Sequence, residues 1–217
     1  MPEFVPPHPR ALIRHAVVRT LKEHPAVAAL LGERVYPNRE EHWLQDELPA
    51  AGVYTLSEQA LDSDVSPDPR ERRIDLAVEI LAGMSEAVDD TLDRLCLAVE
   101  RALCLDAIGE AMGAIINEMR AAAGLPPMEK IRRDGRLLWP VDTLLTLKLT
   151  GTDIGIAVEG DRQIGVAVLS YDLEYDALAG AGPLPDFLLA MAGWDVEPHD
   201  GKIDMESRME FEPPENE

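Results

Sequence analysis

The chain has 217 residues, of which 41 are acidic and 20 are basic, so its formal net charge near neutral pH is −21. Apolar residues make up 46% of the sequence, which excludes wholesale disorder and predicts a chain that buries a sizeable core. The negative charge argues against a body that binds nucleic acid or anionic lipid, because both require a positive surface.

Cysteine content and apolar runs predict where the chain is made. Cys96 and Cys104 lie in one predicted helix, about 12 Å apart, which is beyond the reach of a disulfide. No apolar run is long enough to span a membrane, and the first residues lack the order of a signal peptide. We therefore expect a chain that is made and kept in a reducing cytoplasm, with no membrane partner.

The N-terminal third predicts an arm followed by two helices. Residues 1–9 contain four prolines, which favours an extended arm. From residue 10 to residue 21, apolar side chains recur every three or four positions, as in an amphipathic helix. Pro25 begins a second, shorter helix that ends at Gly32.

The middle of the chain predicts two strands and the longest amphipathic helix. Residues 52–56 are rich in strand-forming side chains, and residues 73–80 alternate strictly between apolar and polar side chains. Residues 86–103 follow with an apolar stripe, acidic side chains early and arginines late, an order that suits the helix dipole. The short link between the strands favours antiparallel pairing.

The last third predicts an insert followed by a hairpin. Residues 106–139 hold a helix over 107–123, which Gly109 and Gly113 weaken, and then a basic stretch. Strands are predicted over 145–150 and 154–158, and a turn at 159–162 leads into a return strand over 164–175. The apolar set changes parity near Val168 and Leu169, which predicts either a bulge or burial on both faces.

These elements predict an α/β protein of the α+β type. We expect one mixed, mainly antiparallel sheet of about four to five strands, with helices packed on one face. The predicted organisation is an arm over residues 1–9, a single domain over 10–176 and an acidic extension over 177–217. Residues 195–217 alone hold nine acids and two bases.

No catalytic, metal-binding or cofactor-binding residues are assigned, and we expect a protein that is not an enzyme. The acidic segment from Asp62 to Asp68 has a proline where a calcium loop needs glycine. Asp172 and Glu174 share one strand face about 7 Å apart. They leave a small carboxylate-dependent hydrolase as a remote alternative.

Six residues form the candidate interface. A basic stretch stands out in the acidic chain, and it fits either a plain surface loop or a contact with an acidic neighbour such as a second copy. A second group follows residues 36–37 and fits either an interface or a lid on the core, since tryptophan and arginine are enriched at interface centres. The residues are Lys130, Arg132, Arg133 and Arg136 in the first group, and Arg39 and Trp43 in the second.

Four segments, in this order, resemble the tail terminator (minor tail protein U-like) and tail-completion proteins of long-tailed bacteriophages. Each motif is short, and together they span most of residues 10–176. They are GERVYP at 32–37, LPAAGVY at 48–54, RIDLAVEI at 73–80 before the helix over 86–103, and GDRQIG at 160–165 before LSYDLEY at 169–175.

The resemblance implies a structural virion protein. Members of the family form rings, commonly hexamers, that cap the tail tube, stop its polymerisation and offer the other side to the head. The implied partners are further copies of the chain, the tail tube protein and the head–tail connector, with genomic DNA passing through the lumen without specific binding. The implied location is the head-proximal end of the phage tail, after assembly in the cytoplasm of the bacterial host. Another connector, neck or tail-completion protein remains the alternative.

Overall fold

The computed structural model describes residues 7–39, 43–61, 71–85, 87–133, 136–141, 143–159 and 162–177. The helices are α1 (Pro9–Glu23), α2 (Pro25–Leu31), the 3₁₀ turn η1 (Gln45–Glu47), α3 (Val88–Ala102) and α4 (Leu105–Ala122). The strands are β1 (Val35–Pro37), β2 (Ala50–Ala60), β3 (Glu71–Gly83), β4 (Ile131–Arg133), β5 (Arg136–Leu138), β6 (Leu144–Glu159) and β7 (Arg162–Asp176). None of the helices in these ranges has the length and apolar character needed to cross a bilayer.

Five strands form one sheet in the order β1-β2-β3-β7-β6, and β4 pairs with β5 in a separate hairpin. β1 runs parallel to β2, and all other neighbours are antiparallel. The expected α+β class, with a mixed and mainly antiparallel sheet, is therefore confirmed. β1 and β6 are the outermost strands of the sheet.

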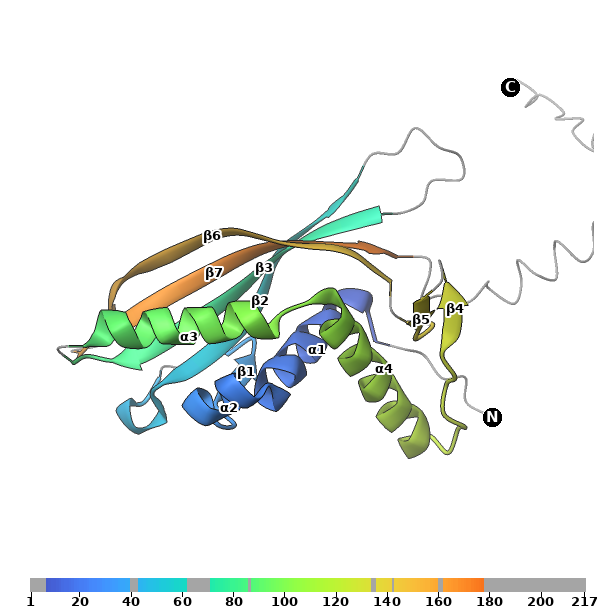
Figure 1. The fold of residues 1–217 in the computed structure, drawn as a ribbon, viewed down its shortest axis with the longest axis horizontal. Coiled ribbons are helices and arrows are strands. Elements are labelled where there is room, and N and C mark those ends of the chain that lie inside the picture. Colours follow the sequence, from blue (N-terminus) through green and yellow to red (C-terminus); the bar gives the residue numbers. More distant parts are fainter. Residues whose placement is uncertain are drawn as a thin grey trace, which may run out of the picture. The chain divides into compact units, whose positions relative to one another are not determined.

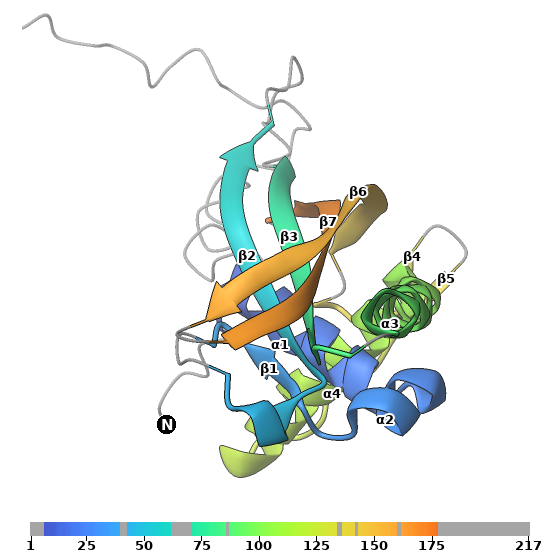
Figure 2. The ribbon, with the colours of Figure 1, turned by 90° about the vertical axis from the view of Figure 1, so that its left-hand side faces the viewer.

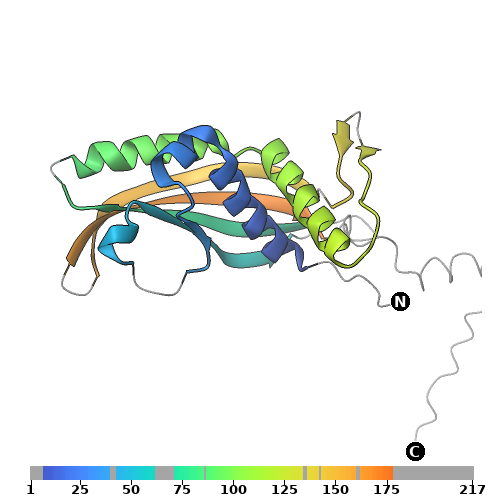
Figure 3. The ribbon, with the colours of Figure 1, turned by 90° about the horizontal axis from the view of Figure 1, so that it is seen from below.

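The helices lie on one face of this sheet (Figures 1 and 3). α1 contacts β1 and β2, and α3 contacts β3 and β7. Seen from the end in Figure 2, the helices stay on one side of the strands. This side is called the covered face below, and the opposite side is called the open face.

Alternation along β3 decides which side chains enter the core. Ile74, Val78 and Ile80 are fully buried on the covered face, and their partners in β7 include Leu173 and Leu169, which are also fully buried. α3 meets them with Leu92, Leu95 and Val99, while Asp89 and Asp90 lie in its first turn and Arg101 in its last. Periodicity and charge order along these two elements thus predict the packing that the structure has.

α4 belongs to the same core. Ile108, Met112 and Ile116 are almost completely buried, and the helix packs on α1. Gly113 makes room for Trp139, because a Cβ at this position would overlap the indole ring. The glycine that weakens the helix locally therefore allows the following segment to dock on it.

Several expectations need correction at their boundaries. β2 and β3 are longer than predicted, and the helix expected to begin at residue 86 begins at Val88. The predicted bulge near Val168 is absent, because β7 pairs with β3 without interruption. On the open face Ile164 is buried but Val166 and Val168 are only half-buried, whereas Leu169 is buried on the covered face. The register shifts lie in β6 instead, between Leu144 and Thr146 and between Leu149 and Gly151.

Some predicted segments lie outside the described residues. These are residues 1–6 of the arm, the acidic segment 62–70 and nearly all of the extension over 177–217. Pro9, the last residue of the predicted arm, is the first residue of α1, and His8 caps this helix by accepting a hydrogen bond from Arg10 N at 3.2 Å.

Candidate functional site

The open face of the sheet carries mostly acidic side chains. Because directly paired residues share a face, the register assigns to it seven acids and three cations whose side chains the structure describes. None of the described helices lies on this face (Figure 1). The acids are Glu71, Asp75, Glu79, Asp153, Asp172, Glu174 and Asp176, and the cations are Arg73, Lys148 and Arg162.

The two carboxylates considered for hydrolysis lie on this face. Arg73 donates to Glu174 at 2.7 and 3.2 Å, and the Thr146 hydroxyl donates to the same carboxylate at 3.1 Å. The bonds from Arg73 hold the pKa of Glu174 below its usual range. Glu174 is therefore held in its ionised form, which does not suit a general acid at neutral pH.

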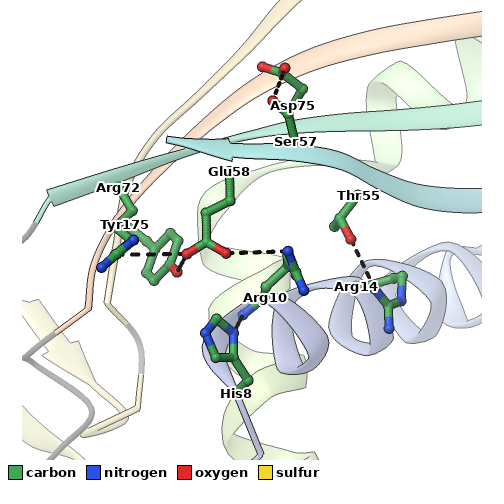
Figure 4. Close-up of polar contacts among 9 residues, drawn as sticks. All are labelled: His8, Arg10, Arg14, Thr55, Ser57, Glu58, Arg72, Asp75 and Tyr175. Carbon is green, nitrogen blue, oxygen red and sulfur yellow. Dashed lines mark hydrogen bonds and ion pairs between the residues drawn. The ribbon is translucent and has the colours of Figure 1, made fainter. Parts of the chain in front are cut away.

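A polar cluster that the sequence did not reveal joins the first turn of α1 to β2, β3 and β7. Figure 4 shows Glu58 on the covered face, with Tyr175 and Arg72 on one side of it and Arg10 on the other. The Tyr175 hydroxyl donates to Glu58 at 2.6 Å, and Arg10 and Arg72 approach the carboxylate at 3.6 and 3.8 Å. Burial, and secondarily the bond to Glu58, raises the pKa of Tyr175 above its ordinary value. The cluster neutralises an acid at the helix–sheet boundary.

The neighbouring residue faces the other way. The Ser57 hydroxyl donates to Asp75 on the open face, so consecutive residues of β2 serve opposite sides of the sheet (Figure 4). On the covered face, Arg14 donates to Thr55 Oγ1 at 2.9 Å, and desolvation lowers the pKa of this arginine. These contacts hold α1 against β2.

We expect Tyr175→Phe to lower the free energy of unfolding by about 1–2 kcal/mol, because the ring stays buried while a hydrogen bond to a carboxylate is lost. Urea unfolding followed by circular dichroism measures the change. Tyr36→Phe is the control, since the Tyr36 ring is half-buried against Arg39 and Trp43. An equal loss in both variants would contradict a special role for the Glu58 bond.

Arg39 and Trp43 belong to a compact cluster. The Arg39 guanidinium lies 4.3 Å from the Trp43 ring centroid and 5.1 Å from that of Tyr36, and it forms an ion pair with Glu47 at 2.7 Å. The Arg39 side chain is only 13% exposed. It therefore joins Tyr36, Trp43 and Glu47 in one cluster.

Trp43 also lines a shallow groove at this end of the sheet. Leu48, the end of β3 and the start of β7 form its other walls, and Met84 lies on its rim with 42% of its surface exposed. The groove is open and contains few charged side chains. Gln45, Arg162 and Gln163 line it together with these apolar side chains, so its walls are more polar than apolar.

The predicted basic stretch forms the β4–β5 hairpin and the segment before it. Lys130 pairs with Glu110 of α4 and lies 5.1 Å from the Trp139 ring centroid, and Arg136 pairs with Asp106. These two cations therefore attach the hairpin to α4. Arg132 is exposed in β4, and the side chain of Arg133 lies outside the described part.

The described part of the chain contains no candidate metal-binding site. Among those residues, no three histidine, cysteine or acidic side chains are grouped so that they would hold an ion. Asp75 and Asp172 are directly paired across β3 and β7, with Lys148 beside Asp172 on β6.

The described residues define an α+β domain with a one-sided five-stranded sheet. No protein-family model and no curated protein matches the sequence. Among solved structures, the fold is similar to a chain of the "Virion of native gene transfer agent (GTA) particle" at 17% sequence identity and a TM-score of 0.43. The similarity covers 75% of this chain and 93% of that chain.

Proposed function

We propose that this chain is a structural subunit of a tailed phage-type virion. In the finer form of the proposal it is a tail terminator, which forms a ring on the finished tail tube, stops its growth and offers a joining surface to the head. Tube growth is an open-ended head-to-tail assembly, so a subunit that matches the tube on one side only binds once and ends it. The chain acts as a building block rather than an enzyme.

The sheet that is covered on one face and acidic on the other carries this proposal. The segments that resemble tail terminators fall on neighbouring strands: residues 32–37 lead into β1, 48–54 into β2, 73–80 lie in β3 and 169–175 in β7. With helices outward, the open face would line a channel. Its excess of acids would repel DNA phosphates and let DNA pass without adhering.

Electron microscopy of the purified protein with isolated tail tubes tests the proposal. Rings in solution, and a single layer of added density at tube ends, are the expected results, and tubes capped in this way should no longer elongate when tube protein is added. Monomers alone, with no binding at tube ends, would contradict it. Binding to isolated connectors but not to tubes would assign the chain to the neck instead.

We predict that reversing two cations of the hairpin, in an Arg132→Glu/Arg133→Glu variant, weakens ring formation. A second copy carries the same large negative charge, so an exposed cation at a contact lowers repulsion, and the loss is larger at low salt. Sedimentation velocity at two salt concentrations measures it. The control is Arg94→Glu/Arg101→Glu, which makes the same charge change on exposed positions of α3. An unchanged sedimentation profile would assign the hairpin no part in the contact.

A further inference from the structure

The outer edge of β6 is unusually open. β6 is 16 residues long and is the last strand of the sheet, whereas the opposite margin ends in β1, which has three residues including Pro37. Natural proteins protect sheet edges with short strands, prolines, lysines and bulges. β6 has Lys148 and its two register shifts in its first half, but residues 151–159 pair regularly with β7. The second half is therefore a regular edge that no described strand covers.

This second half of β6 exposes apolar side chains. Ile154, Ile156 and Val158 are 47%, 60% and 71% exposed. Their register partners in β7 place them on the covered face, beside Gly165, which is closed off by Val88 and Leu92 of α3. α3 thus covers β7 but stops short of β6. A row of three exposed β-branched residues on a free edge is typical of a contact surface.

The distribution of charge favours a second copy of this chain as the partner that binds the edge of β6. Residues 144–158 contain one lysine and one aspartate, so this stretch is neutral in a chain of net charge −21. The opposite margin is nearly neutral too, because Glu58, the acid within residues 54–60 of β2, is paired with Arg10 and Arg72. Two copies of an acidic protein meet with least repulsion where their surfaces are neutral.

Strand direction favours head-to-tail contact. β1 reaches only residues 51–53 of β2, so residues 54–60 have no described strand on that side. β2 and β6 run in opposite directions, since three antiparallel steps separate them. When copies are related by rotation around a ring, β6 of one copy meets the β1–β2 margin of the next in antiparallel orientation, the arrangement that backbone hydrogen bonds favour.

We infer that the edge of β6 pairs with the β1–β2 margin of a second copy, so that the sheets of neighbouring subunits join. This inference rests on the proposed ring and names its contact. Strand addition supplies main-chain hydrogen bonds, and the row of Ile154, Ile156 and Val158 supplies apolar burial at the contact.

An Ile154→Lys/Ile156→Lys variant tests the surface. Both side chains are exposed, so the subunit should keep its fold, while two lysines on the edge should weaken assembly by at least tenfold in concentration. Leu97→Lys is the control, because Leu97 is 47% exposed on α3, away from the sheet margins. Circular dichroism checks the fold and sedimentation velocity measures assembly. Assembly by the edge variant equal to that of the control would overturn the inference.

Cross-linking tests the direction of the contact. In a Cys104→Ser background, Cys96 stays unreactive because burial raises its pKa to about 11. One preparation carries Gln59→Cys on β2, and three others carry a cysteine at Thr146, Asp153 or Ala157 along β6. A bis-maleimide is expected to join the β2 variant to at least one β6 variant. Cross-links only between identical β6 variants, or none in intact rings, would overturn the inference.

These outcomes separate the contact from the function. If the wild-type protein forms rings and the β6 variant forms them equally well, the terminator proposal stands and the β6 contact is rejected. A wild-type protein that forms no ring and binds no tube end removes the terminator proposal itself.

Discussion

Gly165→Val is expected to lower the free energy of unfolding by about 3 kcal/mol. Gly165 lies in β7 on the covered face, where a Cβ would overlap a methyl group of Val88 and lie 3.2 Å from Leu92 Cδ1. A branched side chain there separates α3 from the sheet, and overpacking of this kind in a close-packed core costs about 1–3 kcal/mol or more. Urea unfolding followed by circular dichroism measures the loss.

Gly155→Val is the matched control for this prediction. Gly155 lies in β6 on the open face and is paired with Val166, and a Cβ there meets nothing within 4 Å. A valine on an exposed strand should leave stability unchanged or raise it slightly. Equal losses at both positions would mean that the strands, rather than the contact with α3, set the cost.

A second substitution locates the strain. The milder Gly165→Ala variant still overlaps Val88, so adding Val88→Ala should recover part of the lost stability. The two changes then show a favourable coupling in a double-mutant cycle, because they act on one contact. Strict additivity would place the strain elsewhere.

The elements with strong periodicity could be predicted from sequence, and the reason is local. β3 alternates over its whole central part, and α3 combines an apolar stripe with charges ordered along its dipole, so neither needs distant information. β1 could not be found in this way. It has three residues, one of them Pro37, and it becomes a strand through parallel pairing with residues 51–53 of β2.

The candidate residues were harder to judge, because their partners are far away in sequence. Lys130 and Arg136 look like free cations in a basic run, but they pair with Glu110 and Asp106 of α4. Arg39 is similarly bound by Glu47. Periodicity predicted a strand through Ile154. Whether its side chain is buried depends on which elements lie beside β6, and this is decided by the order of the strands in the sheet, which periodicity does not give.

The open face gives the prediction with the largest functional effect. A Glu71→Lys/Asp153→Lys/Asp172→Lys variant changes this face from seven acids and three cations to four acids and six cations, counting the side chains that the structure describes. If the face lines the channel, assembled rings should retain duplex DNA at about 50 mM salt and release it near 200 mM, because phosphate contacts weaken steeply with salt. Gel retardation across a salt series measures retention.

The control for this variant keeps the net charge and changes only its position. An Asp90→Lys/Asp93→Lys/Glu100→Lys variant also changes the net charge of each subunit from −21 to −15. Its lysines stand on exposed positions of α3, the helix that packs on the covered face, and not on the open face. It should not retain DNA inside rings, because its lysines lie on the outside. Equal retention by the two variants would mean that total charge decides, and the open face would then not be the surface that DNA passes. Retention by the open-face variant alone, in rings that still cap tubes, would place the acidic side of the sheet along the path of the DNA.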